Sequence, residues 1–576
     1  MIGFKQNDRW RAARWALGIG IALAAGCQPD AGTDPAQPIP SLASAPILIT
    51  NARIYTMDAG DTLIASGAMA FSADGEILGI GDSEPMANAF PAAELIDLEG
   101  RTVLPGLIDG HGHLYGLALA YTQADLVGTT STSDVLERLR RFAADLPEGD
   151  WLLGHGWDQN DWPEPVFPGR EDLDAEFPDR PVWLVRIDGH AGWANSAALA
   201  QADRDLSGDW QPQGGHIQRD AEGLATGILI DRAMAWVERA VPPPSDQIID
   251  ATLDRAVQTL LSLGLTGVHD PGVNRAVVDR YREKIRNGTM PLRVYAMADG
   301  AGETLDWLCA EGPVNHPSGR LVMRSVKLYT DGALGSRGAA LLEDYSDDPD
   351  NRGLLFDTDA DLQAKMRRAM ACGLQLGVHA IGDRANRQVL DAYAALLPEF
   401  PDNPGRHRVE HAQVLNPADI PRFTELGVIA AMQPIHATSD MYWADERLGP
   451  ERLPGAYAWN SLLQSGAILA FGSDFPVEAV NPMLGIYAAV TRQDLEGWPA
   501  GGWQAKERLD RADAVRAFTL NAAYAAFMEG DIGSLETGKR ADFIVVDRDL
   551  MSVPAEEIPQ VKVLQTWVDG QRVFER

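Results

Sequence analysis

The chain has 576 residues, 45% of them hydrophobic, and its 49 Lys and Arg residues against 82 Asp and Glu residues give a formal net charge of −33. This length is too great for one small domain, and the hydrophobic content excludes a disordered chain. A surface this acidic excludes nucleic acid as a partner, because binding it requires a positive footprint. Three cysteines are too few for a disulfide framework, and Cys309 and Cys372 are expected to be small buried apolar residues.

Residues 1–27 have the organisation of a bacterial export signal. Lys5 and Arg9 belong to a basic region, and the apolar run 15–25 is too short to span a bilayer as a helix. The run ends in Leu-Ala-Ala-Gly-Cys, which resembles a lipobox and implies cleavage before Cys27 and lipidation of its sulfur. We therefore expect an exported lipoprotein, periplasmic or at the cell surface, with the lipid as its only membrane contact. A secretory signal cleaved nearby and an uncleaved anchor are the alternatives.

The next segments predict a tether and then a β domain built from both ends of the mature chain. Residues 28–44, rich in Pro, Ala, Asp and Ser, predict a flexible tether. Residues 45–103 read as short alternating strands broken by turns, and residues 529–576 have the same style. Because the termini of a domain often lie together, we expect these two parts to form one small composite β-sandwich.

Between these parts, residues 104–528 alternate apolar strands with helical stretches. Repeated βα units over this length predict an α/β fold, a distorted (β/α)8 barrel of the TIM type. There are more than eight candidate strands, the first at 101–108, so some of them must belong to an insertion. The region of about 145–240, dense in Trp, Pro, Asp and Gly, is predicted to be that insertion.

The first barrel strand ends in two histidines one residue apart. On an extended strand, residues i and i+2 point the same way, so His111 and His113 can aim two imidazoles at one point. Gly110 and Gly112 are expected to leave room for a bound ion beside them. Two histidines on one strand face suit a divalent transition metal, whereas two ordinary histidines at a turn are the alternative.

Four more ligand-type residues follow at the ends of later apolar runs: Lys327, His379, His411 and Asp474. In a βα barrel the active site lies at the carboxyl ends of the strands. The chain has only 11 histidines, and four of them fall at such strand ends, where chance would scatter them through loops. We therefore expect six side chains to converge on one metal site.

This set of residues resembles the amidohydrolase superfamily. The phrases VKLYTDGALGSRGA, HAIGDRAN, RVEHAQ and GSDFPVE are similar to the branch that includes N-substituted formamide deformylase. The resemblance implies one or two divalent ions, Zn first among them, with His111 and His113 on one ion and His379 and His411 on a second. It also implies that Lys327 is carboxylated and bridges two ions.

Asp474 would ligate a metal and act as the general base toward the attacking water, so Asp474 and Lys327 are the expected catalytic residues. Each assignment has an ordinary alternative. Lys327 could form a plain ion pair, which would leave a site for one ion. Asp474 could cap a helix, and His411 could be a hydrogen-bond donor behind the ligands rather than a ligand.

Four residues are expected to bind substrate. His190, in Asp-Gly-His of the insertion, and His269, at the end of a candidate strand, would reach the pocket. Trp157 could line an aromatic pocket, and Arg337 could clamp a substrate carboxylate. The alternatives are an exposed loop histidine, a packed core histidine, a core tryptophan and an arginine paired with a surface acid.

The residues and the resemblance together predict a metal-dependent hydrolase that cleaves a non-peptide C–N bond of a small molecule, an amide or an N-formyl or N-acyl amine. The alternatives are an esterase, lactonase or cyclic amidase that uses the same site, or a lipid-anchored binding protein without turnover. An oligomer is compatible with the sequence, which does not identify the substrate or the metal.

Overall fold

The computed structural model describes residues 45–144, 146–147 and 149–576. The predicted signal peptide, the tether and the lipidation site Cys27 lie outside the described residues. Within the described part of the chain, no helix is both long enough and apolar enough to cross a membrane.

A barrel of eight parallel strands forms the centre of the described fold, as predicted. The strands follow in the order β6, β13, β14, β16, β17, β18, β19 and β20. Their bounds are Leu107–Asp109, Leu265–Val273, Arg293–Asp299, Leu321–Tyr329, Gln375–Ala380, Arg408–His411, Ile429–Met432 and Leu469–Phe471. A hydrogen bond of 2.8 Å from the Gly110 amide to the Phe471 carbonyl brings the first and last strands together. The distorted TIM-type barrel is therefore confirmed.

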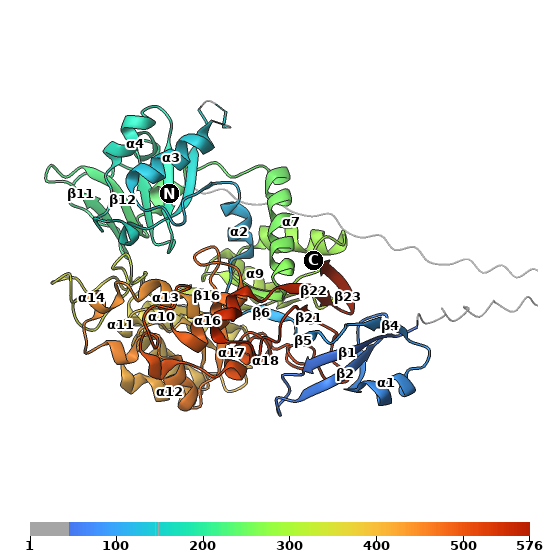
Figure 1. The fold of residues 1–576 in the computed structure, drawn as a ribbon. Helices are drawn as coiled ribbons and strands as arrows, with labels where there is room; N and C mark the ends of the chain where they lie inside the picture. The colour runs from blue at the N-terminus through green and yellow to red at the C-terminus, as the bar shows by residue number, and fades with distance from the viewer. Residues whose placement is uncertain (1–44, 145, 148) are drawn as a thin grey trace, which may run out of the picture. The chain divides into compact units, whose positions relative to one another are not determined.

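Helices accompany these strands, as Figure 1 shows. They are α2 (Leu114–Ala120), α7 (Asp246–Ser262), α8 (Arg275–Arg286), α9 (Glu303–Glu311), α10 (Asp359–Ala371), α11 (Asp383–Leu396), α12 (Ile420–Leu426), α13 (Pro434–Asp440), α14 (Ala444–Leu448), α15 (Trp459–Gln464), α16 (Pro482–Thr491), α17 (Arg511–Ala517) and α18 (Leu520–Ala525). Helix α7 shows why they form. The Ser245 hydroxyl accepts a hydrogen bond from the Ile248 amide, and buried residues recur at 249, 253, 256, 257, 260 and 261, the spacing of one helix face.

Strand β16 illustrates the barrel core and the exception within it. A parallel strand covered on both faces is expected to be a nearly continuous apolar run, and most of Leu321–Tyr329 is buried. Lys327 interrupts this run, although its exposed fraction is only 1%. Because lysine is almost never fully buried without a partner, this position points to a functional site.

The composite β domain joins both ends of the described chain. Its strands are β1 (Ile47–Tyr55), β2 (Leu63–Phe71), β3 (Ile77–Asp82), β4 (Glu94–Asp97), β5 (Thr102–Pro105), β21 (Phe543–Val546), β22 (Val563–Val568) and β23 (Gln571–Glu575), in one eight-stranded sheet. Strands β5 and β21 pair antiparallel and link the two halves. The halves also face each other, since the rings of Phe71 in β2 and Trp567 in β22 lie 5.8 Å apart. Figure 1 shows the blue and red strands side by side.

The predicted first barrel strand, 101–108, is divided between two sheets. Residues Thr102–Pro105 belong to the composite sheet and Leu107–Asp109 to the barrel, with Gly106 between them. A Cβ atom at Gly106 would come within 2.2 Å of the Thr266 hydroxyl, so the crossing point has no room for a side chain. An apolar run alone could not reveal this change of sheet.

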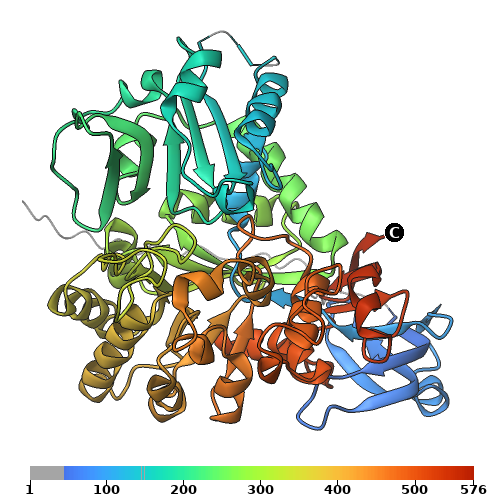
Figure 2. The same cartoon turned by 60° about the vertical axis from the view of Figure 1, so that its left-hand side comes forward.

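The insertion has its own six-stranded sheet, drawn in teal and green in Figure 2. It contains β7 (Ala124–Asp125), β8 (Leu152–Trp157), β9 (Val182–Arg186), β10 (Ala191–Ala194), β11 (Gly215–Arg219) and β12 (Ala225–Asp231), together with α3 (Thr132–Ala143) and α4 (Arg170–Glu176). The sheet starts at residue 124, earlier than the predicted boundary near 145. The amphipathic helix α3 resembles a barrel helix in sequence, but it packs on β7 and β8.

A disulfide joins Cys309 in α9 to Cys372 at the end of α10, with 5.2 Å between the Cα atoms. The expectation of two separate apolar cysteines is therefore wrong. Helices α9 and α10 precede the neighbouring strands β16 and β17 in the chain. This arrangement brings the C-terminal ends of the two helices together. Composition could not show it, because the two cysteines are 63 residues apart in the chain.

We predict that replacing both Cys309 and Cys372 by serine lowers the free energy of unfolding. Closing a loop of 63 residues reduces the entropy of the unfolded chain, which corresponds to about 4 kcal/mol in the chain-entropy description. Urea unfolding followed by tryptophan fluorescence measures the change. The control is dithiothreitol, which should lower the midpoint of the wild type and leave that of the double variant unchanged. Equal midpoints for the two oxidised proteins would contradict the prediction.

Candidate metal centre

The seam between β6 and β20 brings the first and last predicted ligands together. The amide of Asp474 donates to the carbonyl of His111 (2.6 Å), and the amide of His113 donates to the carbonyl of Phe475 (2.8 Å). Just below, the buried carboxylate of Asp109 accepts hydrogen bonds from the amide and the hydroxyl of Ser473. These contacts hold the imidazoles of His111 and His113 beside the carboxylate of Asp474.

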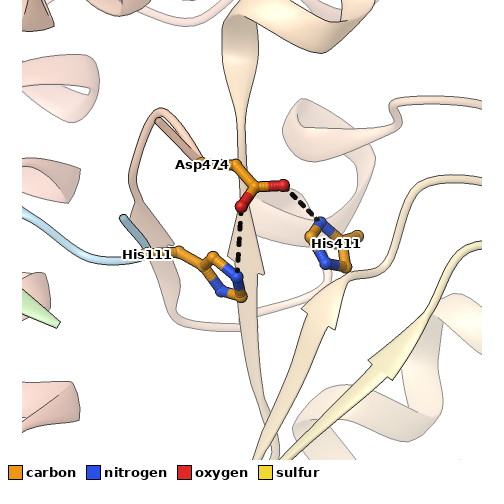
Figure 3. A group of neighbouring side chains, drawn as sticks. All are labelled: His111, His411 and Asp474. Atoms are coloured by element: carbon orange, nitrogen blue, oxygen red, sulfur yellow. Dashed lines mark ion pairs between the residues drawn. The ribbon is translucent and has the colours of Figure 1, made fainter. Parts of the chain in front are cut away.

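Three of the predicted ligands form a compact group. The ligand atoms of His111, His411 and Asp474 all lie within 4.8 Å of one another, and all three residues are buried. Figure 3 shows the carboxylate of Asp474 between the two imidazoles. Its Oδ1 lies 3.6 Å from the Nε2 of His111, and its Oδ2 lies 3.9 Å from the Nδ1 of His411.

The other three predicted ligands border this group. The Nε2 of His113 lies 3.1 Å from the Oδ1 of Asp474, and the Nζ of Lys327 lies 3.2 Å from the Nε2 of His111. The rings of His379 and His411 are 4.6 Å apart. The structure thus brings all six predicted residues together, from the ends of five different strands.

Three of the four predicted histidine ligands are oriented by an oxygen acceptor at Nδ1. The Nδ1 atoms of His111, His113 and His411 lie next to oxygen acceptors: Glu410 Oε2 at 2.5 Å, the Pro271 carbonyl at 3.2 Å and Gln433 Oε1 at 2.8 Å. A proton on Nδ1 leaves the lone pair on Nε2, which is how metal-binding histidines are usually oriented.

The protonation states suit a cation. Burial holds the pKa of His111, His379 and His411 well below its usual value, so these imidazoles are neutral and can donate a lone pair. Burial also lowers the pKa of Lys327 to about 8. Burial alone would raise the pKa of Asp474, but the surrounding imidazoles hold it well below its usual range.

Two buried atoms show that this set fits a metal. Among the described residues, the Nε2 of His379 and the Oδ1 of Asp474 have no hydrogen-bond partner. A buried polar atom without a partner costs free energy, and metal ions, or water bound to them, would satisfy these two atoms. The backbone is also strained here, since His411 and Asp474 have φ of +74° and +63°. Such strain clusters at functional sites.

A buried network lies behind His111. The guanidinium of Arg408 contacts both carboxylate oxygens of Glu410, with Nε 2.7 Å from Oε1 and Nη2 2.9 Å from Oε2, and its Nη1 lies 2.8 Å from the Nδ1 of His269. Glu410 and Arg408 are fully buried. Sequence reasoning missed Glu410, although it is the residue before His411 in the same strand.

His436 is a second residue that sequence reasoning missed. Its Nε2 lies 3.5 Å from the Oδ2 of Asp474 and its Nδ1 lies 3.0 Å from the Oε1 of Glu478. Burial would lower the pKa of His436, but these two carboxylates raise it to about 10. The signal was the position just after strand β19, in Gln-Pro-Ile-His, where the chain already turns into helix α13.

The glycines of the His-X-His motif serve packing rather than room for an ion, contrary to expectation. A Cβ atom at Gly112 would lie 2.3 Å from the ring of Phe475. A Cβ atom at Gly110 would lie 2.7 Å from the carbonyl oxygen of Phe471. Both glycines therefore let the β20 end approach the motif.

A cavity of about 880 Å³ opens above the metal centre, between the barrel and the insertion. Of the four predicted substrate residues, His190 lines it, and its Nδ1 lies 2.7 Å from the Oδ1 of Asp231. Burial lowers the pKa of His190, but the hydrogen bond and charge of Asp231 outweigh burial and raise it.

Trp157 does not line this cavity, contrary to expectation. It is fully buried in the insertion core, its ring 5.9 Å from that of Trp193. The reason is a register shift between His155 and Trp157, where Gly156 has φ of +98°. Such a bulge reorients the following side chain, so His155 lines the cavity and Trp157 does not.

His269 and Arg337 also lie away from the cavity lining. Strand β13 continues to Val273, so His269 is one layer deeper in the barrel than predicted, against Arg408. Arg337 pairs with Asp347 at 2.9 Å, which is the surface ion pair left open as its alternative.

We predict that Glu410→Gln weakens metal binding without unfolding the chain. The amide keeps the shape but loses the charge that orients His111, and loss of such a partner typically lowers metal affinity about 10–100-fold. Competition with a chromophoric chelator gives the metal Kd. Glu478→Gln is the matched control, because Glu478 bonds His436 rather than a predicted ligand. Equal Kd values for the wild type and Glu410→Gln would refute the role.

Comparisons with known proteins agree with this geometry. The model of the amidohydrolase family described as "Amidohydro_3" matches residues 94–574. YtcJ of Bacillus subtilis is 34% identical over 536 residues, which cover 91% of this chain and 98% of YtcJ. The N-substituted formamide deformylase of Arthrobacter pascens is 29% identical over 563 residues, with 92% and 98% covered.

A solved structure is similar over nearly the same length. The crystal structure of an uncharacterized metal-dependent hydrolase from Pyrococcus horikoshii has a TM-score of 0.71 and 29% identity, and the match covers 89% of this chain and 99% of that chain. The family match, the barrel and the six converging side chains lead to one conclusion. The chain belongs to the amidohydrolase family and is a hydrolase that acts on carbon–nitrogen bonds.

Proposed function

We propose that the protein is a metal-dependent hydrolase that releases an amine from a small N-formyl or N-acyl amine. The convergence of six predicted side chains from separate strands at one buried point carries this proposal. The full-length similarity to an N-substituted formamide deformylase supports the choice of bond. One or two ions, with zinc as the first candidate, suit a set of imidazoles and a carboxylate.

The predicted ligands form two sets. His111, His113 and Asp474 would hold one ion, and His379 and His411 would hold a second. When bound, a divalent ion polarises the scissile carbonyl and lowers the pKa of water toward neutrality.

Asp474 moves the proton. Its pKa lies well below the usual range, so it is a carboxylate at neutral pH and can accept a proton from the attacking water. The Oδ1 atom, which has no hydrogen-bond partner among the described residues, is the atom to accept it. The same carboxylic acid then protonates the leaving nitrogen, and the amine departs neutral.

Lys327 would act as a carbamate. An ammonium group has no lone pair to offer a metal, so a lysine at this position must be neutral or modified. With its pKa lowered to about 8, a sizeable fraction of the amine is free to react with carbon dioxide near neutral pH. The product is a carbamate and one released proton, and the carbamate could bridge two ions.

The charged residues that line the cavity near Asp158 favour a neutral or cationic substrate. Arg186 lines the cavity, but it is already paired with Asp158 and Asp188. Asp161 also lines the cavity, and it forms no ion pair with any described residue. Burial and the carboxylates of Asp158 and Glu478 raise its pKa to about 6, so a cation beside it would be stabilising.

We also propose that the protein is exported and held to a membrane by a lipid on Cys27. The lipobox-like sequence supports this location. The Cys309–Cys372 disulfide supports export independently, because structural disulfides persist mainly in oxidising compartments.

We predict that the metal-loaded protein hydrolyses N-benzylformamide, and that the charge of a para substituent changes kcat/KM. A para-aminomethyl group should raise kcat/KM, and a para-carboxylate should lower it at least about tenfold, since one like-charge contact costs more than about 1.4 kcal/mol. The rate of amine release is measured for both substrates at the same pH. In Asp161→Asn the difference in kcat/KM between the two substrates should be smaller than in the wild type.

Two results would contradict this assignment. Hydrolysis of esters or lactones without any hydrolysis of formamides or acyl amines would identify an esterase or lactonase. A protein that purifies with less than stoichiometric metal and turns over none of these compounds would be a binding protein.

We predict that Asp474→Asn lowers kcat about 10²–10⁴-fold, the usual contribution of a positioned acid or base. The amide retains the shape of the side chain but cannot accept the proton. Far-UV circular dichroism checks the fold, and elemental analysis checks whether metal is retained. A variant that keeps both its metal and its full activity would exclude Asp474 as the base.

A further inference from the structure

A tyrosine on strand β16 belongs to the cavity wall above the metal centre. Tyr329 is the last residue of this strand, two positions after Lys327, so both side chains lie on the same face of the strand. The residue is half-buried and lines the cavity. The Nζ of Lys327 lies 5.0 Å from the centre of its ring. The strand that supplies a predicted ligand therefore also supplies a phenol to the cavity.

The phenol of Tyr329 lies along the rim of the metal centre. In the strand register Tyr329 is opposite His379, and the two rings are 5.7 Å apart. The hydroxyl lies toward β13, since a Cβ atom at Gly272 would come within 3.3 Å of it. Gly272 follows Pro271, whose carbonyl lies 3.2 Å from the Nδ1 of His113. The side chain thus extends from His379 to the backbone that supports His113.

The hydroxyl of Tyr329 differs from the other tyrosine hydroxyls of the barrel region. Five of the described tyrosines are no more than 1% exposed, and the hydroxyl of each donates a hydrogen bond; they are Tyr281, Tyr295, Tyr345, Tyr393 and Tyr457. The hydroxyl of Tyr329 forms no hydrogen bond with any described residue. A polar group on a cavity wall that has no protein partner is available to a ligand.

The chemistry of a phenol selects the atom that it would serve. A phenol keeps its proton below about pH 10, so it is a neutral donor that needs no prior protonation. In the proposed reaction Asp474 accepts the proton of the attacking water, and a donor to that water would weaken it as a nucleophile. The carbonyl oxygen is the atom that gains negative charge, and a fixed donor beside it lowers the barrier.

We propose that Tyr329 donates a hydrogen bond from its hydroxyl to the carbonyl oxygen of the scissile amide and stabilises the charge that develops on that oxygen. The inference rests on the proposed function for the identity of the oxygen. It makes Tyr329 a catalytic residue in addition to the six predicted ligands. The proton stays on the hydroxyl throughout, so the step needs no further reactant.

The first test compares Tyr329→Phe with Tyr121→Phe. The first variant loses only the hydroxyl and keeps the ring beside Lys327 and His379. Tyr121, at the end of α2, bonds Thr259 at 3.2 Å and does not line the cavity. Removal of one donor to a developing oxyanion typically lowers kcat about 10²–10³-fold. We expect this loss on N-benzylformamide in Tyr329→Phe, at unchanged metal content and thermal midpoint, and no loss in Tyr121→Phe. Full activity of Tyr329→Phe would overturn the proposal.

The separate values of kcat and KM distinguish a catalytic hydroxyl from one that only binds substrate or supports the metal site. A donor that acts on the developing charge lowers kcat and kcat/KM by the same factor. A raised KM with unchanged kcat would mean that the hydroxyl only binds the substrate, and it would overturn the proposal. A lower metal content in Tyr329→Phe, with activity restored by excess metal, would overturn it as well.

A binding measurement distinguishes failure of this inference from failure of the proposed function. N-benzyl methylphosphonamidate carries a tetrahedral anionic centre where the carbonyl would stand, and calorimetry with the metal-loaded protein gives its Kd. We expect at least about tenfold weaker binding to Tyr329→Phe than to Tyr121→Phe, because a hydrogen bond to a charged oxygen is lost. This difference in a wild type that hydrolyses neither N-benzylformamide nor N-benzylacetamide would refute the proposed function alone. Equal Kd values, with turnover intact in the wild type, would refute the role of Tyr329 alone.

Discussion

The closure of the barrel between its first and last strands is the constraint on which the site depends. Asp474 and His111 are distant in sequence, yet an amide–carbonyl hydrogen bond of 2.6 Å joins their backbones. A carboxylate beside two imidazoles is stable only because backbone contacts hold it there. The positive φ of +63° at Asp474 is part of the cost, and the seam around it supplies the compensating contacts. Any change that opens this seam would move Asp474 away from His111 and His113, even if none of these side chains is replaced.

The polar groups behind the ligands extend this constraint outward. Glu410 and Gln433 each accept from an Nδ1 and so determine the tautomer of a histidine. Arg408 in turn balances the charge of Glu410 and donates to the carbonyl of Gly110 at 2.7 Å. The barrel interior below the candidate metal centre therefore contains a buried charged network rather than an apolar layer.

The six site residues could be predicted because their signals are local. A short apolar run that ends in a ligand-type residue can be recognised anywhere in a βα chain, and the fold brings such ends to one face. Glu410 could not be predicted in the same way, since its partner His111 is 299 residues away. Trp157 was misplaced because one bulge at Gly156 decides which face it occupies. The extent of the insertion and the disulfide likewise depend on tertiary neighbours that no local pattern encodes.

The composite sheet has a consequence for how this protein could be divided. Strand β5 leads directly into β6 through Gly106, while β21 returns from the other end of the chain to pair with β5. Buried Arg293 of the barrel strand β14 binds Asp542 next to β21 at 2.6 Å, which fastens the same sheet to the barrel. A single cut therefore never releases an intact barrel. Recombination with a relative, whether in evolution or in engineering, must exchange both flanking segments together, because either one alone leaves half a sheet with unpaired edges.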